Sequence, residues 1–568
     1  MASKKAEDRD FAYHVRLLAQ SARDTSASSD ATQETAILDS IKQLHAMCEG
    51  HIDLVGTINT PMSKLFQRCS ASISQYRSST CLLMLAMLQF YLDFGDYVLH
   101  DADPSLNIFF KSCLSRLYAD RTVACATLDF LNHNKRKLLL SHPALLPQYF
   151  PLLLKIIAWN GTIVAESFLQ LFPALMGPSS FLPLFLALLD LPTLVLALEN
   201  LECRSGSLLS NNVSMIQKSP APEALLALMD EAYTGSSTPD QGGDSGDESS
   251  TSKDEAEALF ADLLRDENDG LAERHWTFPG MAAALEAVMG SARSDRLKQS
   301  INLAPRLLQL YFQVAIRDVD DSLLCALLPT LFLRIDAMFP DKNFSSEAQK
   351  KCLEFMLAAF QRSPELISIV KKPIIDKIGQ PYSSPAKAEL ALQLCWAVGE
   401  YGGGGPSHKA AARELFECLE LLLYENLSSR NARRVGDPSR VLSEGTIHER
   451  ASQARLLSVV VTAITKLATC HRELVPRAHV CLAKVARSHQ VLDKIVWRRA
   501  RDYLGLMHEP AICSSILGPT SGNNDQAGTI RWADANSKAV THIPFFLLQE
   551  KEGPPFHDFT LSDLLGLA

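Results

Sequence analysis

Apolar residues recur every three or four positions through the second half of the chain. Between Pro305 and Ile316, Leu307, Leu308 and Tyr311 fall at this spacing, which predicts one amphipathic helix. A polar break at 318–321 supplies capping residues for the next helix. The same pattern predicts a series of helices with breaks between them: Pro305–Ile316, Leu323–Met338 (halted by Pro340), a helix starting at Asn343, Pro364–Ile378, Pro385–Val398 and Ser407–Tyr424.

The predicted helices pair into hairpins that recur about every forty residues, which is the spacing of HEAT and armadillo arrays. The first half of the chain follows the same pattern less regularly, with predicted helices at Ser79–Phe94, Ala102–Tyr118, Thr122–Leu140, Pro143–Ala158 and Thr162–Met176. No stretch alternates in the manner of a β-strand. The pattern therefore predicts an all-α, HEAT/armadillo-like α-solenoid, in which each hairpin hides its apolar face against its neighbours.

A polar, acidic stretch rich in Ser and Gly interrupts this pattern at 233–256. Its composition predicts a solvated, disordered loop, and serines beside acids leave a phosphorylated regulatory segment as the alternative. We therefore expect a helical solenoid at 1–232, the acidic loop, a second solenoid at 257–510, and a weakly ordered tail at 511–568. The tail ends in FHDFTLSDLLGLA, a short amphipathic stretch that could dock on the body or on a partner.

Composition narrows the classes of function. The chain is 47% hydrophobic and carries a net charge of −9, which disfavours general nucleic-acid binding. The most apolar stretch, Pro151–Leu198, is interrupted by charges and prolines, and the N-terminus lacks a secretory pattern, so the chain is expected to be soluble or peripheral. Short basic clusters are expected to be solvated helix ends, with contact to acidic lipid as the alternative: Lys135-Arg136-Lys137, Lys371-Lys372, Arg430–Arg434 and Arg498-Arg499.

A search for catalytic, cofactor and metal motifs finds none with a suitable context. Cys470, His471, His479 and Cys481 lie close together, but their spacing does not match that of zinc knuckles. The glycine run at 399–405 follows a predicted helix, so it is expected to end that helix and form a turn. The sequence thus predicts no enzyme, no cofactor and no small-molecule substrate.

Two short segments are more distinctive. The first, Trp396-Ala397-Val398-Gly399-Glu400-Tyr401-Gly402, resembles the Trp-x-Ile/Val-Gly-Glu-Tyr-Gly signature in the trunks of large adaptins and β-type coatomer chains. The second, Arg499-Ala500-Arg501-Asp502-Tyr503-Leu504, is similar to the segment that closes adaptin trunks. We interpret the first as a packing element, in which Trp396 joins an apolar face and Gly399 admits a close neighbour. The polar tips of Glu400 and Tyr401 are expected to tie the turn.

The resemblance implies an adaptin trunk-like scaffold. The chain ends too soon after Tyr503 for the ear of ordinary large adaptins, which favours the most divergent branch, the zeta subunits of the fifth adaptor-protein complex, in a short form. That branch implies a second large chain, a medium chain and a small chain as partners. It also implies peripheral membrane association on late endosomes and lysosomes, and contact with spatacsin- and spastizin-like proteins. The alternative is a free-standing HEAT-repeat scaffold or transport receptor.

Overall fold

The computed structural model describes residues 2–23, 31–71, 77–199, 294–335, 337–380, 385–404, 408–434, 444–488 and 492–507. Within these ranges every regular element is a helix. Contacts group the chain into two units. Unit 1 comprises Met1–Tyr311 and Met338–Ala348, and unit 2 comprises Phe312–Ala337 and Gln349–Ala568. The boundaries predicted at 232 and 256, and the tail from 511, lie outside the described residues.

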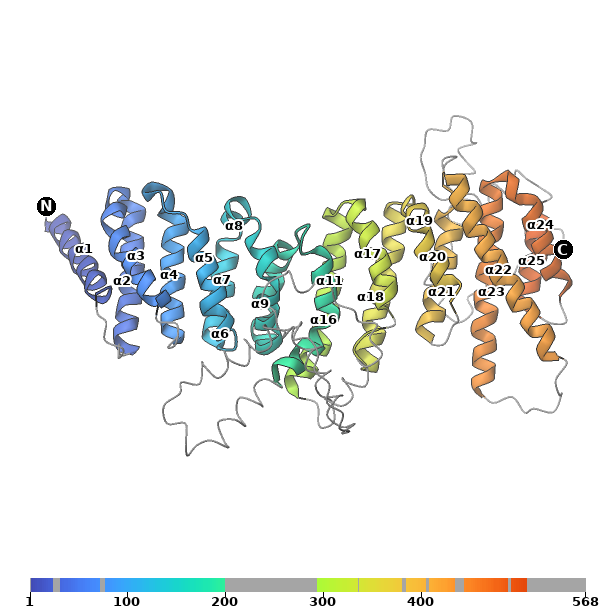
Figure 1. The fold of residues 1–568 in the computed structure, drawn as a ribbon, viewed down its shortest axis with the longest axis horizontal. Helices are drawn as coiled ribbons and strands as arrows, with labels where there is room; N and C mark the ends of the chain where they lie inside the picture. Colours follow the sequence, from blue (N-terminus) through green and yellow to red (C-terminus); the bar gives the residue numbers. More distant parts are fainter. Residues whose placement is uncertain are drawn as a thin grey trace, which may run out of the picture. The chain divides into compact units, whose positions relative to one another are not determined.

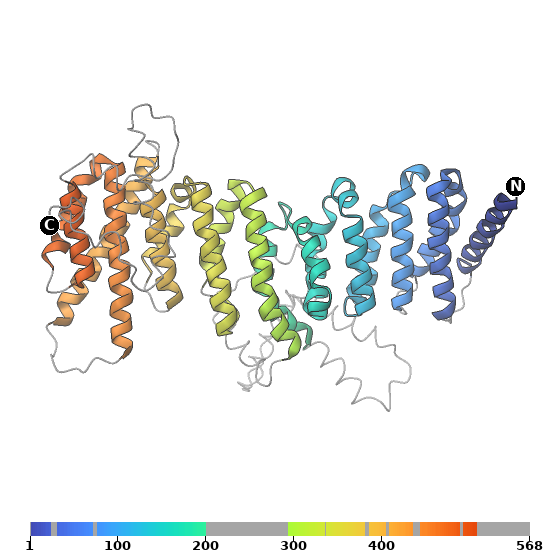
Figure 2. The same ribbon diagram turned by 180° about the vertical axis from the view of Figure 1, so that it is seen from behind.

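Unit 1 is a series of antiparallel helices that lie side by side in chain order (Figures 1 and 2). Its elements are α1 (Ala2–Ser21), α2 (Ala31–Gly50), η1 (Ile52–Leu54), α3 (Val55–Ala71), α4 (Ser78–Phe94), η3 (Gly95–Val98), α5 (Asp103–Ile108), a π-helical turn η4 (Phe109–Leu114), α6 (Ser115–Leu117), α7 (Arg121–His133), α8 (Lys135–Ser141), α9 (Leu145–Asn160), η5 (Gly161–Ile163), α10 (Ala165–Leu171), η6 (Phe172–Leu175), α11 (Phe181–Leu189) and the first part of α16 (Asp295–Asp318).

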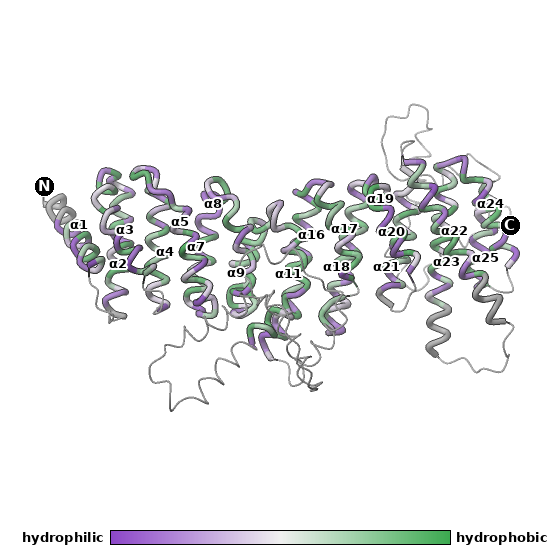
Figure 3. Tube along the Cα trace, viewed as in Figure 1, coloured by the Kyte–Doolittle hydropathy of each residue, from purple (hydrophilic) through white to green (hydrophobic). Residues whose placement is uncertain are grey.

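Unit 2 continues the helical pattern and contains both of the signature segments. It holds the end of α16, α17 (Asp321–Arg334), most of α18 (Lys342–Arg362), α19 (Leu366–Ile369), α20 (Lys371–Ile378), α21 (Pro385–Tyr401), α22 (Lys409–Arg434), α23 (Glu444–Cys470), η9 (Arg472–Leu474), α24 (Val475–Arg487) and α25 (Lys494–Met507). Both units are α-solenoids, so the predicted fold class is confirmed. Hydrophobic and hydrophilic residues alternate along most helices, as expected for amphipathic helices packed in layers (Figure 3).

Aspartates cap two of the helices. Asp120 precedes α7, and its carboxylate accepts the backbone N–H groups of Thr122 and Val123 at 2.8 and 3.1 Å. Asp341 does the same for α18, where it accepts the N–H of Phe344 at 2.9 Å. Such caps satisfy N–H groups that have no partner within the helix. The cap places the start of α18 one residue before the predicted start.

Several predicted helices are broken or shorter in the structure. The predicted helix Pro364–Ile378 is divided at Val370 into α19 and α20. The cause is Pro373, which has no N–H to donate to the carbonyl of residue 369. The predicted helix 122–140 is likewise divided, at Asn134, into α7 and α8. The predicted helix ending at 338 stops at Arg334.

After residues 200–293, unit 1 continues with α16, which packs against α11. Tyr311 of α16 is fully buried, and its ring stacks on Phe181 of α11 with 5.2 Å between centroids. Its hydroxyl donates to the Phe181 carbonyl at 2.9 Å. A buried tyrosine with a satisfied hydroxyl contributes apolar area without an unpaired polar group. The acidic stretch therefore falls between two helices that are in direct contact.

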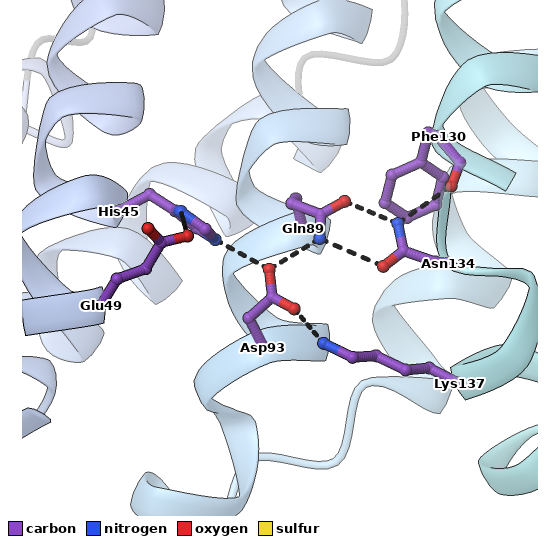
Figure 4. A network of polar contacts seen from close by, with 7 residues as sticks. All are labelled: His45, Glu49, Gln89, Asp93, Phe130, Asn134 and Lys137. Carbon is purple, nitrogen blue, oxygen red and sulfur yellow. Dashed lines mark hydrogen bonds and ion pairs between the residues drawn. The ribbon is translucent and has the colours of Figure 1, made fainter. Parts of the chain in front are cut away.

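Polar side chains also join neighbouring hairpins of unit 1 (Figure 4). Asp93 of α4 accepts from His45 of α2 at 2.8 Å and from Gln89 at 2.6 Å, and it forms an ion pair with Lys137 of α8. Gln89 in turn donates to Asn134 at 3.1 Å. Burial works against the charge, but the hydrogen bonds from His45, Gln89 and Lys137 together hold the pKa of Asp93 below its usual value. The network links three successive hairpins through one carboxylate.

Two described helices are long and apolar enough to cross a membrane: Ser78–Val98 and Ala451–Cys470. A bent pair, Phe181–Leu189 with Leu191–Glu199, would make a third. Of the first two segments, 56% and 72% are buried inside the protein. The first packs against α2, α3 and α7, and the second against α21 and α25. Their apolar residues therefore serve contacts between helices in this fold.

Candidate functional site

The first signature segment lies where α21 packs against α23. A Cβ atom added to Gly399 would lie only 2.7 Å from the Cα atom of Ala463 on α23. Real Cβ atoms do not approach a backbone atom so closely, so the two helices fit together only because residue 399 is glycine. The neighbour is α23, and α22 lies between the two in sequence. The next turn continues the contact, because Gly402 faces Leu467 of α23.

A buried ion pair lies beside this close approach. Glu400 of α21 accepts a hydrogen bond from the Lys466 ammonium of α23, and both residues are at least 94% buried. A buried charge is tolerated only when it is paired, since desolvation costs several kcal/mol per ion. The sequence suggested that Glu400 would tie a local turn. In the structure it instead pairs with a residue of another helix.

The rest of this segment differs from its predicted structure at two points. Helix α21 was predicted to end at Val398, but it continues through Tyr401. Gly402 then donates its N–H to the Val398 carbonyl at 2.8 Å. Trp396 is half-buried and meets the edge of Tyr401 at 5.9 Å between ring centroids. Burial and the Glu400 charge raise the pKa of Tyr401 to about 12. Because Trp396 is half-exposed, Trp396→Ala should lower the free energy of unfolding by less than the loss for a core aromatic, which is about 3–5 kcal/mol.

The second signature segment lies on α25 and packs on the same helix, α23. Tyr503 is fully buried, and its hydroxyl is 3.0 Å from the Thr462 hydroxyl. Ala500, one turn earlier, is also fully buried, while Leu504 is half-buried. Arg499 is 94% buried, and its Nε has no hydrogen-bond partner. This segment therefore contributes a buried helix face, in which the Nε atom of Arg499 lacks a hydrogen bond to any described residue.

Thr462 and Ala463 are adjacent on α23, and they meet the two signature segments separately. Residues that follow each other on a helix point about 100° apart, so one helix can contact two neighbours in this way. The structure thus brings both segments together around α23, which we call the α23 junction. The sequence reasoning missed the residues that α23 contributes, Thr462, Ala463 and Lys466. The only sequence signal for these contacts was the helical spacing of apolar residues in α23, and that spacing does not specify which helix packs against it.

Ion pairs and polar contacts extend the junction to α22 and α24. Arg477 of α24 bonds to Glu417 at 2.9 Å and also pairs with Glu420, both on α22. Cys481 of α24 lies 3.2 Å from the Tyr424 hydroxyl. These exposed or half-exposed charges each contribute modestly to stability, on the order of 0.2–1 kcal/mol. They align the two helices.

The four residues considered for a metal site do not form one. Cys470 lies against Gly403, whereas Cys481 faces α22. Burial raises the pKa of both thiols to about 11. Across the part of the chain that the structure describes, no three His, Cys, Asp or Glu side chains are grouped to hold an ion.

The predicted basic clusters are partly engaged in contacts within the protein. Lys135 donates to the Gln170 carbonyl at 2.8 Å, and Lys371 pairs with Glu414 at 2.7 Å. Arg498 is half-buried and lies on α25. The side chains of the cluster at 430–434 lie outside the described residues.

Comparison with known proteins places these features in a family. Residues 32–155 match a family model described as "AP-5 complex subunit, vesicle trafficking". Residues 238–541 match one described as "AP-5 complex subunit zeta-1, C-terminal TPR repeats", so the family description assigns these hairpins to the TPR type of solenoid. The second match alone covers more than half of the chain and includes the α23 junction.

Two curated relatives are named AP-5 complex subunit zeta-1. The protein from Mus musculus is 24% identical over 527 residues, and that from Homo sapiens is 24% identical over 525 residues. Each alignment covers 90% of this chain and 59% of the relative, so the chain spans about three-fifths of the length of these relatives. No solved structure matches the chain. The extent of the second family match shows that the chain belongs to the AP-5 complex subunit zeta-1 family.

Proposed function

We propose that the chain is a non-enzymatic large subunit of a heterotetrameric adaptor complex, and that it acts as a scaffold in vesicle-mediated transport. The observation that carries the proposal is the alignment over 90% of the chain to relatives named as AP-5 complex subunits. The packing supports a scaffold, because the α23 junction uses its distinctive residues to join helices. Glu400 and Tyr401 of the signature are thereby buried.

The finer parts of the proposal follow from the family. The partners are a second large chain, a medium chain and a small chain, with spatacsin- and spastizin-like proteins as further contacts. The complex is proposed to lie in the cytoplasm, peripherally on the membranes of late endosomes and lysosomes. These assignments rest on membership of the family.

A scaffold needs exposed apolar residues that a partner can cover. Unit 1 has two such leucines on neighbouring turns: Leu99, between α4 and α5, is 95% exposed, and Leu140, at the end of α8, is 85% exposed. Leu99 also adopts a left-handed conformation with φ of +51°, which is unfavourable for leucine. The two turns are connected, since Asp103 of α5 lies 3.1 Å from His142, next to α8. We assign these leucines to a contact with another subunit.

The test of the function is native purification of the tagged chain followed by mass spectrometry. The proposal expects a medium and a small adaptor-type chain at about equal stoichiometry. Recovery of the chain without adaptor subunits would contradict it and favour a free-standing scaffold or transport receptor.

The proposed contact at Leu99 and Leu140 is tested by comparing how much of the other subunits each variant recovers in the same purification. Leu99→Asp combined with Leu140→Asp should reduce recovery of the other subunits on the order of tenfold, the equivalent of about 1.4 kcal/mol. Ile163→Asp is the matched control, because Ile163 is 51% exposed on η5, at the opposite end of α9. Equal recovery with the wild type, the double variant and the control variant would exclude this contact but leave the family function intact.

A further inference from the structure

The last two described helices are strongly basic in an acidic protein. Helix α24 carries three Lys or Arg residues and no acid, and α25 carries four with a single acid, Asp502. The whole chain has a net charge of −9. The two helices pack against each other in unit 2 (Figure 1), so their positive charge is concentrated in one region of that unit. Such a concentration favours an acidic ligand.

Part of this charge has no partner among the residues that the structure describes. Arg477 is paired with glutamates of α22, and Lys484 lies over the Tyr424 ring at 4.2 Å. By contrast, four cations are exposed or half-exposed and form no ion pair with any described residue: Arg487, Lys494, Arg498 and Arg501. Unpaired like charges on adjacent turns repel each other, so a counter-charge would stabilise them.

The same two helices also carry exposed apolar side chains. Val480 is 52% exposed and precedes Arg487 by two helical turns, which puts the two on one face of α24. Ile495 is 43% exposed beside Lys494. On α25, Lys494, Arg498 and Arg501 follow the i, i+4, i+7 spacing of a single face. We call the six residues Val480, Arg487, Lys494, Ile495, Arg498 and Arg501 the α24–α25 face.

The chemistry of this face calls for a segment that combines aliphatic or aromatic side chains with carboxylates. The chain contains one at residues 553–568, GPPFHDFTLSDLLGLA, which we call the tail segment. It has six large apolar residues, two aspartates and no Lys or Arg: Phe556, Phe559, Leu561, Leu564, Leu565 and Leu567, with Asp558 and Asp563. The tail segment lies outside the described residues and beyond position 541, where the family match ends.

We propose that the tail segment binds the α24–α25 face. Its aspartates neutralise the unpaired cations, and its leucines cover Val480 and Ile495. The segment follows α25 in the same chain, and tethered segments reach effective concentrations on the order of millimolar, so weak contacts suffice.

The proposal is tested by hydrogen–deuterium exchange of the full-length protein, followed by mass spectrometry of peptides from α24 and α25. Leu564→Ser combined with Leu565→Ser removes apolar contacts of the tail, and Asp558→Arg combined with Asp563→Arg reverses its charge. Either variant should speed exchange in α24 and α25 on the order of tenfold, because undocking leaves the helix ends free to open. Unchanged exchange in both variants would overturn the proposal.

A charge swap separates docking from general destabilisation. Arg498→Asp with Arg501→Asp should also speed exchange, and combining this pair with Asp558→Arg and Asp563→Arg should restore the slow exchange. Failure of the combined variant to restore protection would overturn the proposal and point to another occupant, such as residues 508–541 or a separate chain. Lys372→Glu is the control, because Lys372 is an exposed cation of unit 2 outside this face and should change nothing in α24 or α25.

Discussion

Small and buried residues, rather than reactive ones, determine the character of the α23 junction. Gly399 removes the atom that would collide with Ala463, and Glu400 balances the Lys466 charge inside the protein. Tyr503 fills space and satisfies its own hydroxyl against Thr462. Each residue acts through packing or pairing across helices. Substitutions here should therefore change stability first, and any loss of assembly should follow from it.

Replacing Gly399 with alanine tests the close approach. Gly399→Ala should lower the free energy of unfolding by about 1–3 kcal/mol, because the new methyl group must push α23 away. Gly505→Ala in α25 is the matched control. A Cβ there meets nothing within 4 Å, so alanine should be neutral or stabilise by up to about 1 kcal/mol. Chemical denaturation measures both, and equal effects would contradict the steric argument.

The buried ion pair makes a different prediction. Glu400→Gln alone should destabilise by about 3–5 kcal/mol, because it leaves the Lys466 ammonium buried without a counter-charge. Lys466→Met in the same chain should recover much of that loss by removing the stranded charge. A double-mutant cycle from thermal unfolding measures the coupling. Additive effects of the two substitutions would show that the pair does not act as a unit.

At the scale of helices and hairpins, polar networks align neighbours that apolar packing alone would leave free to slide. The carboxylate of Asp93 connects α2, α4 and α8 in unit 1, and Arg477 connects α24 to α22 in unit 2. Directional hydrogen bonds tolerate little displacement, so they set the register between helices. Apolar contacts then supply most of the stabilisation.

The Asp93 network predicts a dependence on pH. The pKa of Asp93 is depressed in the folded protein, so its contribution is fully present above the unfolded value, near 3.8, and is lost as pH falls through the folded value. Asp93→Asn should therefore destabilise by about 1–3 kcal/mol at pH 7, and the difference from wild type should shrink below about pH 4. The test is denaturant unfolding at several pH values.

Asp96→Asn is the control for that measurement. Asp96 is exposed on η3 and forms no hydrogen bond or ion pair with any described residue, so its replacement should change stability by less than about 0.5 kcal/mol at every pH. A difference between wild type and Asp93→Asn that persists undiminished in acid would show that the carboxylate charge is not the stabilising element.

At the scale of the whole molecule, each helix depends mainly on those near it in sequence, as in other repeat proteins. In unit 2, α23 packs with α21, α22, α24 and α25, and in unit 1, α4 packs with α2, α3 and α7. Among the described helices, α16 departs from this rule, because it contacts α11 after a long stretch of intervening sequence. A destabilising substitution should therefore affect mainly the helices that contact the substituted one.

Hydrogen exchange of Gly399→Ala tests that locality. Peptides from α21, α23 and α25 should exchange faster than in wild type, while those from α4 and α9 in unit 1 should be unchanged, because nearest-neighbour coupling fades along a solenoid. Faster exchange throughout both units would indicate a single cooperative transition instead. Peptides spanning Tyr311 serve as a reference for the intact core of unit 1.

Much of the fold was accessible from the sequence because helical periodicity is a local property. The spacing of apolar residues predicted helices between Ser79 and Met176 and between Pro305 and Tyr424, and their stacking into hairpins. The family signature around Trp396 and Gly399 led to the correct family. The errors fell at boundaries. The break at Val370 and the extension of α21 through Tyr401 depend on one proline and on packing against α23.

The sequence by itself determined that this protein is helical, repetitive and of the AP-5 zeta type, because those properties reside in spacing and in short motifs. Only the tertiary structure decided that Glu400 pairs with Lys466, that Gly399 faces Ala463, and that both signature segments meet on α23. A helical pattern specifies which face of a helix is buried but not which neighbour covers it. That choice depends on the three-dimensional path of the chain between the two helices.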